Sequence, residues 1–196
     1  MASSIAENEI RKSWEVYRRA LLSRNGSLAI QVVDTSTLNY YNGISYAAAH
    51  ATRSDIFNYS LIEKFFIFSI RHRVPHQLAI RMNGATMFSY GVNNGRIDVE
   101  DVQNTVIDEV NIFNDTAIGK GYIIGENEES TFRFVKEGDD WKIDISGVIP
   151  EGEQQMIESK LELNFKTDED YIFFLLESGT GRIVTEYIWI PLTKWK

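Results

Sequence analysis

The sequence predicts an α+β fold, in which helices pack on a curved antiparallel β-meander and a helical or extended C-terminal tail follows the sheet. Three features predict it: two alternating strands that meet at Gly138-Asp139, two more alternating runs just before them, and amphipathic helical segments upstream. The chain has 196 residues, of which 43% are hydrophobic, enough for a sizeable core. We therefore expect a single domain over residues 1–196, with helices and sheet in 1–148 and an extension packed on them in 149–196.

The first segment is predicted to be an amphipathic helix. Ser4 and Glu7 have the spacing of a capping box, and Asn25-Gly26 is a stop signal. Between these signals apolar residues recur at helical spacing: Ile10, Trp14, Tyr17 and Leu21.

Three further segments of the first half have weaker signals. A short helix should cover residues 27–33, and Thr35 or Ser36 can cap a helix that runs to Thr52. Gly43 lies in the middle of that helix. Residues 86–92 fit either a helix or a strand.

The segment after Ser60 should form a central helix. Ser60 and Glu63 make a second capping box, and the residues that follow are apolar nearly all round the helix. Arg71-His72-Arg73 suit the negative end of the helix dipole, and Val74-Pro75 ends the helix. We favour this role at the helix end over ligand binding for the three basic residues.

The hairpin at Gly138-Asp139 fixes the register of the last two strands. Glu137 faces Asp140 across the turn, because glycine reaches positive φ easily in a tight hairpin. Counting outward gives these pairs: Phe134 with Ile143, Phe132 with Ile145, Val135 with Lys142, and Arg133 with Asp144. One face is therefore apolar and needs a cover of helices, whereas the other is mostly polar.

Two runs at residues 105–112 and 116–124 precede the hairpin and complete a four-stranded meander. Gly119 and Gly121 in the second run mark either a bend or bulge in a curved sheet or an exposed edge. The sequence does not decide between a bulge and an exposed edge.

The residues after the sheet should form two helices and a docked tail. Pro150-Glu151-Gly152 breaks the chain before a helix around residues 156–161, and Thr167 caps another that stops at Gly179-Thr180-Gly181. Residues 182–196 are too apolar for a disordered end. They pack on their own domain, which we favour, or form part of a subunit interface.

Charge and composition exclude several classes of function. The 20 basic and 28 acidic residues give a net charge of -8, which opposes binding to nucleic acid or to an anionic membrane surface. The chain has no cysteine, so it has no disulfide, thiol nucleophile or thiolate metal ligand. It also lacks an apolar signal core and a run of roughly 20 apolar residues, so we expect a cytoplasmic protein.

No motif indicates a metal or a cofactor. His72 and His76 are four residues apart, but Pro75 lies between them, so we reject a helical zinc site. Glycines at 119 and 121, and at 179 and 181, lack the context of a phosphate-binding loop. Arg133 facing Asp144 is interpreted as a structural cross-strand pair rather than a catalytic one.

Two segments carry a resemblance to a known family. They are Trp14–Leu22 with the following Asn25-Gly26, and Phe132–Ile145. Together with the order of elements over residues 5–148, they resemble the nuclear transport factor 2-like superfamily, which includes ketosteroid isomerase and scytalone dehydratase. The resemblance implies a cone with a mostly apolar cavity between helices and sheet, and a homodimer formed by the outer face of the sheet.

The resemblance also implies which side chains face the cavity. Phe132, Phe134, Trp141, Ile143 and Ile145 would point toward helices and cavity, and Arg133, Lys142 and Asp144 would point outward. Tyr17 lies on the first helix, as the tyrosine of the isomerases does. No aspartate pair matches theirs, the helical segment before the sheet is longer, and a tail of nearly fifty residues is added.

Six residues are the predicted lining of a pocket: Tyr17, Tyr41, His50, Phe134, Trp141 and Ile143. His50 lies in the small-residue run at 47–51, with Tyr46 one turn away, and tyrosine hydroxyls suit a carbonyl or ring ligand. For His50 we favour an ordinary core or surface role over ligand binding, and for the tyrosines we favour core packing.

The resulting hypothesis is a cone-fold module that binds a small apolar ligand or a protein partner without catalysis, metal or cofactor. One alternative is an isomerase, dehydratase or cyclase that uses His50 or Tyr17 to move protons. The other is a structural interaction domain whose own side chains fill the cavity.

Overall fold

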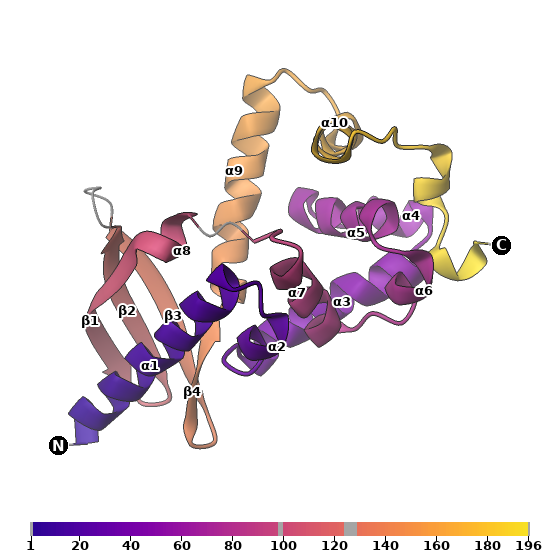
Figure 1. Ribbon diagram of the computed structural model, residues 1–196. Coiled ribbons are helices and arrows are strands. Elements are labelled where there is room, and N and C mark those ends of the chain that lie inside the picture. The colour runs from indigo at the N-terminus through magenta and orange to yellow at the C-terminus, as the bar shows by residue number, and fades with distance from the viewer. Residues whose placement is uncertain (1, 98–99, 124–128, 196) are drawn as a thin grey trace. The chain divides into compact units, whose positions relative to one another are not determined.

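The structure of this chain is a computed structural model that describes residues 2–97, 100–123 and 129–195 (Figure 1). The predicted α+β class is confirmed, with ten helices and a four-stranded antiparallel meander in the order β1-β2-β3-β4 among the described residues. The chain divides into two compact units. The sheet unit is Met1–Asn39 with Ala85–Gly147, and the helical unit is Tyr40–Gly84 with Val148–Lys196.

The sheet unit holds the meander and the helices next to it in the chain. Its elements are α1 (Ala2–Leu22), α2 (Gly26–Ala29), the start of α3 (Thr35–His50), nearly all of α7 (Gly84–Asn93), α8 (Glu100–Asn104), β1 (Thr105–Phe113), β2 (Thr116–Ile123), β3 (Glu129–Glu137), β4 (Asp140–Asp144) and the 3₁₀ helix η1 (Ser146–Val148). The predicted ranges of β1 and β2 are matched closely, and Ile124 lies outside the described residues.

Helix α1 lies across one face of the sheet (Figure 1). The Ser13 hydroxyl on α1 donates a hydrogen bond to the carbonyl oxygen of Trp141 at 2.7 Å, and the Arg11 guanidinium donates to the carbonyl of Ile107. Phe134 and Ile143 are paired as predicted and are fully buried. The apolar face of the hairpin is therefore the face that the helices cover.

Two local expectations in the sheet unit need correction. Helix α1 begins at Ala2, so Ser4 lies inside its first turn instead of capping it. Residues three apart share a face of any helix, so capping-box spacing also occurs within one. The predicted helix at 27–33 ends at Ala29, because residues 30–32 form turns and Val33 then makes a parallel bridge to Ile143.

The glycines of β2 mark a bulge. The register of β1 against β2 shifts between Ile107 and Glu109, where Ile107 faces Gly121. A Cβ atom on Gly121 would lie 2.5 Å from the carbonyl oxygen of Val106, and one on Gly119 would lie 2.9 Å from the Phe134 ring. The structure thus favours the bend or bulge over the exposed edge.

Asp144 was predicted to point outward, but it is buried. Its carboxylate accepts hydrogen bonds from the Ser146 hydroxyl at 2.5 Å and from the Gly147 amide at 3.3 Å. The chain turns into η1 directly after β4 and closes over the side chain. The pair with Arg133 does form, with the Arg133 Nε atom 3.5 Å from Asp144.

The helical unit contains the rest of α3 and seven further helical elements that begin and end within it. These are α4 (Arg53–Ile56), α5 (Leu61–Arg73), α6 (His76–Ala79), α9 (Ile149–Glu162), α10 (Asp168–Thr180) and the 3₁₀ helices η2 (Glu186–Trp189) and η3 (Leu192–Lys194). Ile67 and Phe68 of α5 are fully buried, and the predicted Ser60–Glu63 capping box is present. Pro150 lies in the first turn of α9 and so starts this helix, where proline is tolerated.

The described part of the C-terminal tail, residues 182–195, packs within the helical unit. Ile188, Trp189 and Leu192 are buried. The Trp189 ring lies 5.0 Å from the Phe68 ring and 6.0 Å from the Phe173 ring. Aromatic packing on α5 and α10 therefore holds the tail in place.

Candidate functional site

The six predicted pocket residues are divided between the two units. Tyr17, Phe134, Trp141 and Ile143 belong to the sheet unit, whereas Tyr41 and His50 belong to the helical unit. The first four are all buried, none more than 4% exposed.

Packed side chains surround Tyr17 and Phe134, whereas Trp141 also lines a pocket of about 360 Å³ together with Ser13, Val16 and Val32. The Trp14 ring lies 4.2 Å from the Phe132 ring and 6.0 Å from the Tyr17 ring. The Phe134 ring presses against Gly119, where a Cβ atom would be 2.9 Å away. These contacts are those of a packed core.

Two polar atoms in this core have no hydrogen-bond partner among the described residues. They are the indole nitrogens of Trp14 and Trp141, both buried. A buried donor without an acceptor costs about 1–3 kcal/mol, so it is a place where an acceptor atom would add stability.

The two predicted residues of the helical unit lie in different surroundings. His50 is exposed at the last turn of α3, with its ring 4.4 Å from the Tyr46 ring. Tyr41 is half-buried, 5.9 Å from the Phe66 ring, and burial raises the pKa of Tyr41 to about 12. His50 therefore lacks the dry surroundings that tune a histidine for proton transfer.

The outer face of the sheet, away from α1, follows from the strand register. Because of the bulge, Val106 and Glu109 fall on the same face. The outward pairs across β1 and β2 are Val106 with Tyr122, Glu109 with Lys120, Asn111 with Ile118, and Phe113 with Thr116. Pairing with β3 and β4 adds Arg133, Val135 and Lys142 to this outer face.

Large apolar side chains are exposed on the outer face. Val106, Phe113 and Tyr122 are 41%, 60% and 48% exposed. Basic residues stand beside acidic ones there, since Lys120 faces Glu109 and Arg133 faces Asp144. Aromatic residues are enriched at protein interfaces, whereas Lys, Glu and Asp are depleted there.

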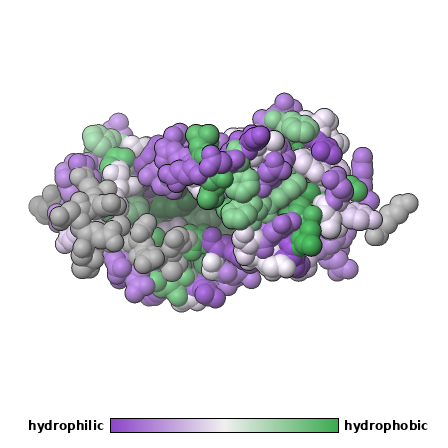
Figure 2. Space-filling view, turned by 90° about the horizontal axis from the view of Figure 1, so that it is seen from above, coloured by the Kyte–Doolittle hydropathy of each residue, from purple (hydrophilic) through white to green (hydrophobic). Residues whose placement is uncertain are grey.

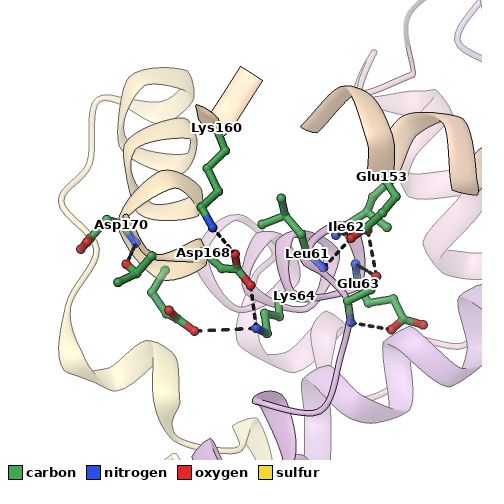
Figure 3. Close-up of polar contacts among 11 residues, drawn as sticks. Leu61, Ile62, Glu63, Lys64, Glu153, Lys160, Asp168 and Asp170 are labelled. Carbon is green, nitrogen blue, oxygen red and sulfur yellow. Dashed lines mark hydrogen bonds and ion pairs between the residues drawn. The ribbon is translucent and has the colours of Figure 1, made fainter. Parts of the chain in front are cut away.

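Sequence reasoning missed a polar site where α9 meets the start of α5 (Figure 3). The Glu153 carboxylate accepts hydrogen bonds from the amides of Leu61 at 3.0 Å and Ile62 at 2.7 Å, and from the Ser60 hydroxyl at 2.9 Å. A carboxylate at a helix N-terminus satisfies free amides and the positive end of the dipole. Gly152 permits the approach, because a Cβ atom there would lie 3.1 Å from Ile62.

A second polar cluster joins α5, α9 and the start of α10 (Figure 3). Asp168 accepts from Lys64 Nζ at 2.9 Å and from Lys160 Nζ at 2.7 Å, and Glu169 lies 3.9 Å from Lys64. Partial burial acts to raise the pKa of Asp168, but the hydrogen bonds from the two lysines outweigh it and hold the pKa below its usual range. No sequence signal links these residues, because they come from three separate helices.

Apolar residues are also exposed near the junction of α9 and α10. Leu161, Leu163 and Phe174 are more than one-third exposed. Figure 2 looks down on the molecule from above and shows hydrophobic patches among mostly hydrophilic side chains. Scattered exposure of this kind is ordinary for a folded protein and assigns no site.

The described residues contain neither a metal-binding cluster nor a membrane-spanning helix. No three His, Asp or Glu side chains come together there as a metal ion would require. None of the described helices combines the length and apolar character needed to cross a membrane.

Comparison of the chain with protein-family models, with curated proteins and with solved structures found no match.

Proposed function

We propose that this chain is a protein-binding module whose outer face receives a second copy of the chain. The observation that carries the proposal is the exposed apolar set on one sheet face, Val106, Phe113 and Tyr122. Aromatic side chains of this kind supply most of the binding energy in protein interfaces.

Charge explains why the occupant is a second copy. The chain carries a net charge of -8, so two copies repel each other over most of their surface. On the outer face, Lys120 stands beside Glu109, Arg133 pairs with the buried Asp144, and Lys142 pairs with Asp140. A face that contains both signs can be complementary to itself, which a two-fold symmetric contact requires. The resemblance to the nuclear transport factor 2-like superfamily implies a dimer through the same face.

Light scattering coupled to size exclusion tests the proposal. We expect the wild-type chain to have twice the mass of one chain, and Tyr122→Glu to reduce it to one. Tyr46→Glu is the matched control, because Tyr46 is an exposed tyrosine that belongs to the helical unit and is not part of the outer face. A wild-type chain of single mass, or equal behaviour of the two variants, would contradict the proposal.

A small ligand inside the sheet unit is a second candidate, favoured by the unpartnered indole nitrogens of Trp14 and Trp141. An apolar ligand with one carbonyl group could accept from either indole. A thermal-shift screen should then find ring ketones that stabilise the chain more than their hydrocarbon analogues. Equal shifts for ketone and hydrocarbon would exclude a role for the indoles.

The enzyme hypothesis has less support, since neither of its alternative proton handlers, Tyr17 or His50, lies in a pocket among the described residues. Tyr17 is packed in the core of the sheet unit, and His50 is exposed on the helical unit.

A further inference from the structure

The helical unit has a groove between the end of α5 and the C-terminal tail, which we name the tail groove. Its volume is about 300 Å³, at the lower end of the range for small-molecule sites. Two kinds of residue line it, basic side chains from α5 and the tail and apolar ones mostly from the tail: Arg71, His72, Arg182, Ile183, Tyr187 and Trp195.

The deepest charge in the tail groove is that of Arg71, which is 3% exposed. Its guanidinium donates to the carbonyl oxygens of Ala48 at 2.9 Å, Ala51 at 2.5 Å and Ile188 at 2.9 Å. Burial lowers the pKa of Arg71 to about 10, so the group stays protonated at neutral pH. Among the described residues the acceptors of Arg71 are carbonyl oxygens and no carboxylate pairs with it, so the positive charge is only partly offset.

Other cations stand close to Arg71. Arg182 Nη2 donates to the carbonyl oxygen of His72 at 2.6 Å, and the Arg182 side chain is otherwise exposed. Burial, followed by the positive charges of Arg182 and Arg73, lowers the pKa of His72, while Glu177 acts to raise it. The Glu177 carboxylate accepts from the Val184 amide at 2.8 Å and does not line the groove.

The tail groove is thus a positive site on a chain of net charge -8. No Asp or Glu is among the described residues that line it. Its walls are apolar, and Ile183 and Tyr187 are largely exposed. An anion with an apolar or aromatic body would match both the charge and the walls.

We propose that the tail groove binds a carboxylate attached to an aromatic or aliphatic group, with Arg182 as the residue that holds the carboxylate. A carboxylate suits the site because the planar fork of one exposed guanidinium matches its two oxygens. Arg71 uses its donors on backbone carbonyls and contributes only charge. The ligand is either a free organic acid or the C-terminus of a peptide, since both present this chemistry.

NMR titration with 3-phenylpropionate tests the site. We expect the acid to shift the indole resonance of Trp195, and the neutral 3-phenylpropanamide to bind at least about tenfold more weakly. High salt should weaken binding of the acid and leave the amide unchanged. Equal binding of acid and amide, or no shift with the acid, would overturn the proposal.

Variants separate Arg182 from general effects of charge. Arg182→Ala should weaken binding of the acid by a factor of about ten or more. Arg81 is an exposed arginine outside the groove, so Arg81→Ala should leave this binding unchanged. Ile183 is 81% exposed, so substitution there does not threaten folding. Ile183→Asp should weaken binding of the acid more than Ile183→Asn does, because only the aspartate repels the carboxylate of the ligand. Loss of binding in Arg81→Ala, or none in Arg182→Ala, would contradict the assignment.

A short peptide ending in phenylalanine with a free carboxylate identifies the source of the ligand. Tighter binding than 3-phenylpropionate would point to a protein C-terminus, and equal or weaker binding to a small acid. Either result supports the carboxylate site, whereas a peptide amide that binds as well as the peptide acid counts against it. The readout does not depend on dimer formation, so this proposal and the proposed function fail separately.

Discussion

The two units use buried charge differently. In the sheet unit the buried carboxylates act locally: Asp34 accepts from the amide of Thr37 at 3.1 Å, and Asp144 accepts from Ser146 and Gly147. In the helical unit Arg71 and Lys64 are buried, and their partners lie far away in the chain. An apolar core with local caps therefore dominates the first unit, whereas long-range polar anchors tie the second together.

Removing a large, fully buried aromatic side chain of the sheet unit should have the largest effect. Phe134→Ala leaves a cavity under α1 and should lower the free energy of unfolding by about 3–5 kcal/mol. Urea denaturation measures this loss. Leu161→Ala is the control, because Leu161 is 66% exposed and its loss should have little effect.

Hydrogen exchange on the same variant sharpens the comparison. Faster exchange confined to the sheet unit would mean that the two units unfold separately. Faster exchange in both would support the prediction of a single domain over residues 1–196. Unchanged exchange near β3 and α1 would contradict the packing described for Phe134.

Breaking the main polar anchor of the helical unit comes next. Arg71→Met leaves the carbonyls of Ala48, Ala51 and Ile188 without their donor and should lower the free energy of unfolding by about 3 kcal/mol. Arg71→Lys should retain only part of the lost stability, because an ammonium group cannot reach all these carbonyl oxygens. Arg81→Met, at an exposed position, should have no measurable effect in the same urea titration.

The sequence predicts well those features that depend on local patterns. The Phe134–Ile143 pair follows from counting outward from one turn, and the Ser60–Glu63 cap follows from three-residue spacing. Both are local patterns. The bulge at Ile107 was not placed from sequence, because an extra residue interrupts the alternation on which the count depends.

Arg71 shows why the helical unit is harder to predict. Its basic neighbours and the following proline indicate a helix end, and the helix does end there. Its partners, however, lie 20 and 117 residues away, at Ala51 and Ile188. The exposure of His50 was also not foreseen from the sequence. The alanines before it turn inward and leave His50 exposed.

A smaller effect is expected for the carboxylate that caps α5. Glu153→Ala removes the acceptor for Ser60, Leu61 and Ile62 and should lower the free energy of unfolding by about 1–2 kcal/mol. Glu153→Gln keeps an acceptor and should lose less. Glu158→Ala, exposed on the same helix, is the control. If the alanine variants at 153 and 158 are equally stable, Glu153 contributes no cap.

The smallest effect is expected at Asp168, and it should depend on pH. The folded pKa of Asp168 lies below its ordinary value of 3.8, because hydrogen bonds from Lys160 and Lys64 outweigh partial burial. A depressed pKa stabilises the fold above the ordinary pKa, and this stabilisation is lost as pH falls through the folded pKa. Asp168→Asn should therefore be less stable than wild type at neutral pH, by about 1 kcal/mol for a partly exposed carboxylate.

The difference between Asp168→Asn and wild type should shrink as the pH falls below 4, because the wild-type carboxylate becomes protonated there. Urea titrations of both chains at several pH values measure this trend. Asp170→Asn is the matched control. The backbone amide of Asp170 donates to the Thr167 hydroxyl in the helix cap, and its carboxylate makes no ion pair with a described residue. A constant difference across the pH range would mean that the lysines hold Asp168 by geometry, with no net contribution from its charge. The polar anchors of the helical unit would then resemble the local caps of the sheet unit more closely than the burial of Lys64 and Arg71 indicates.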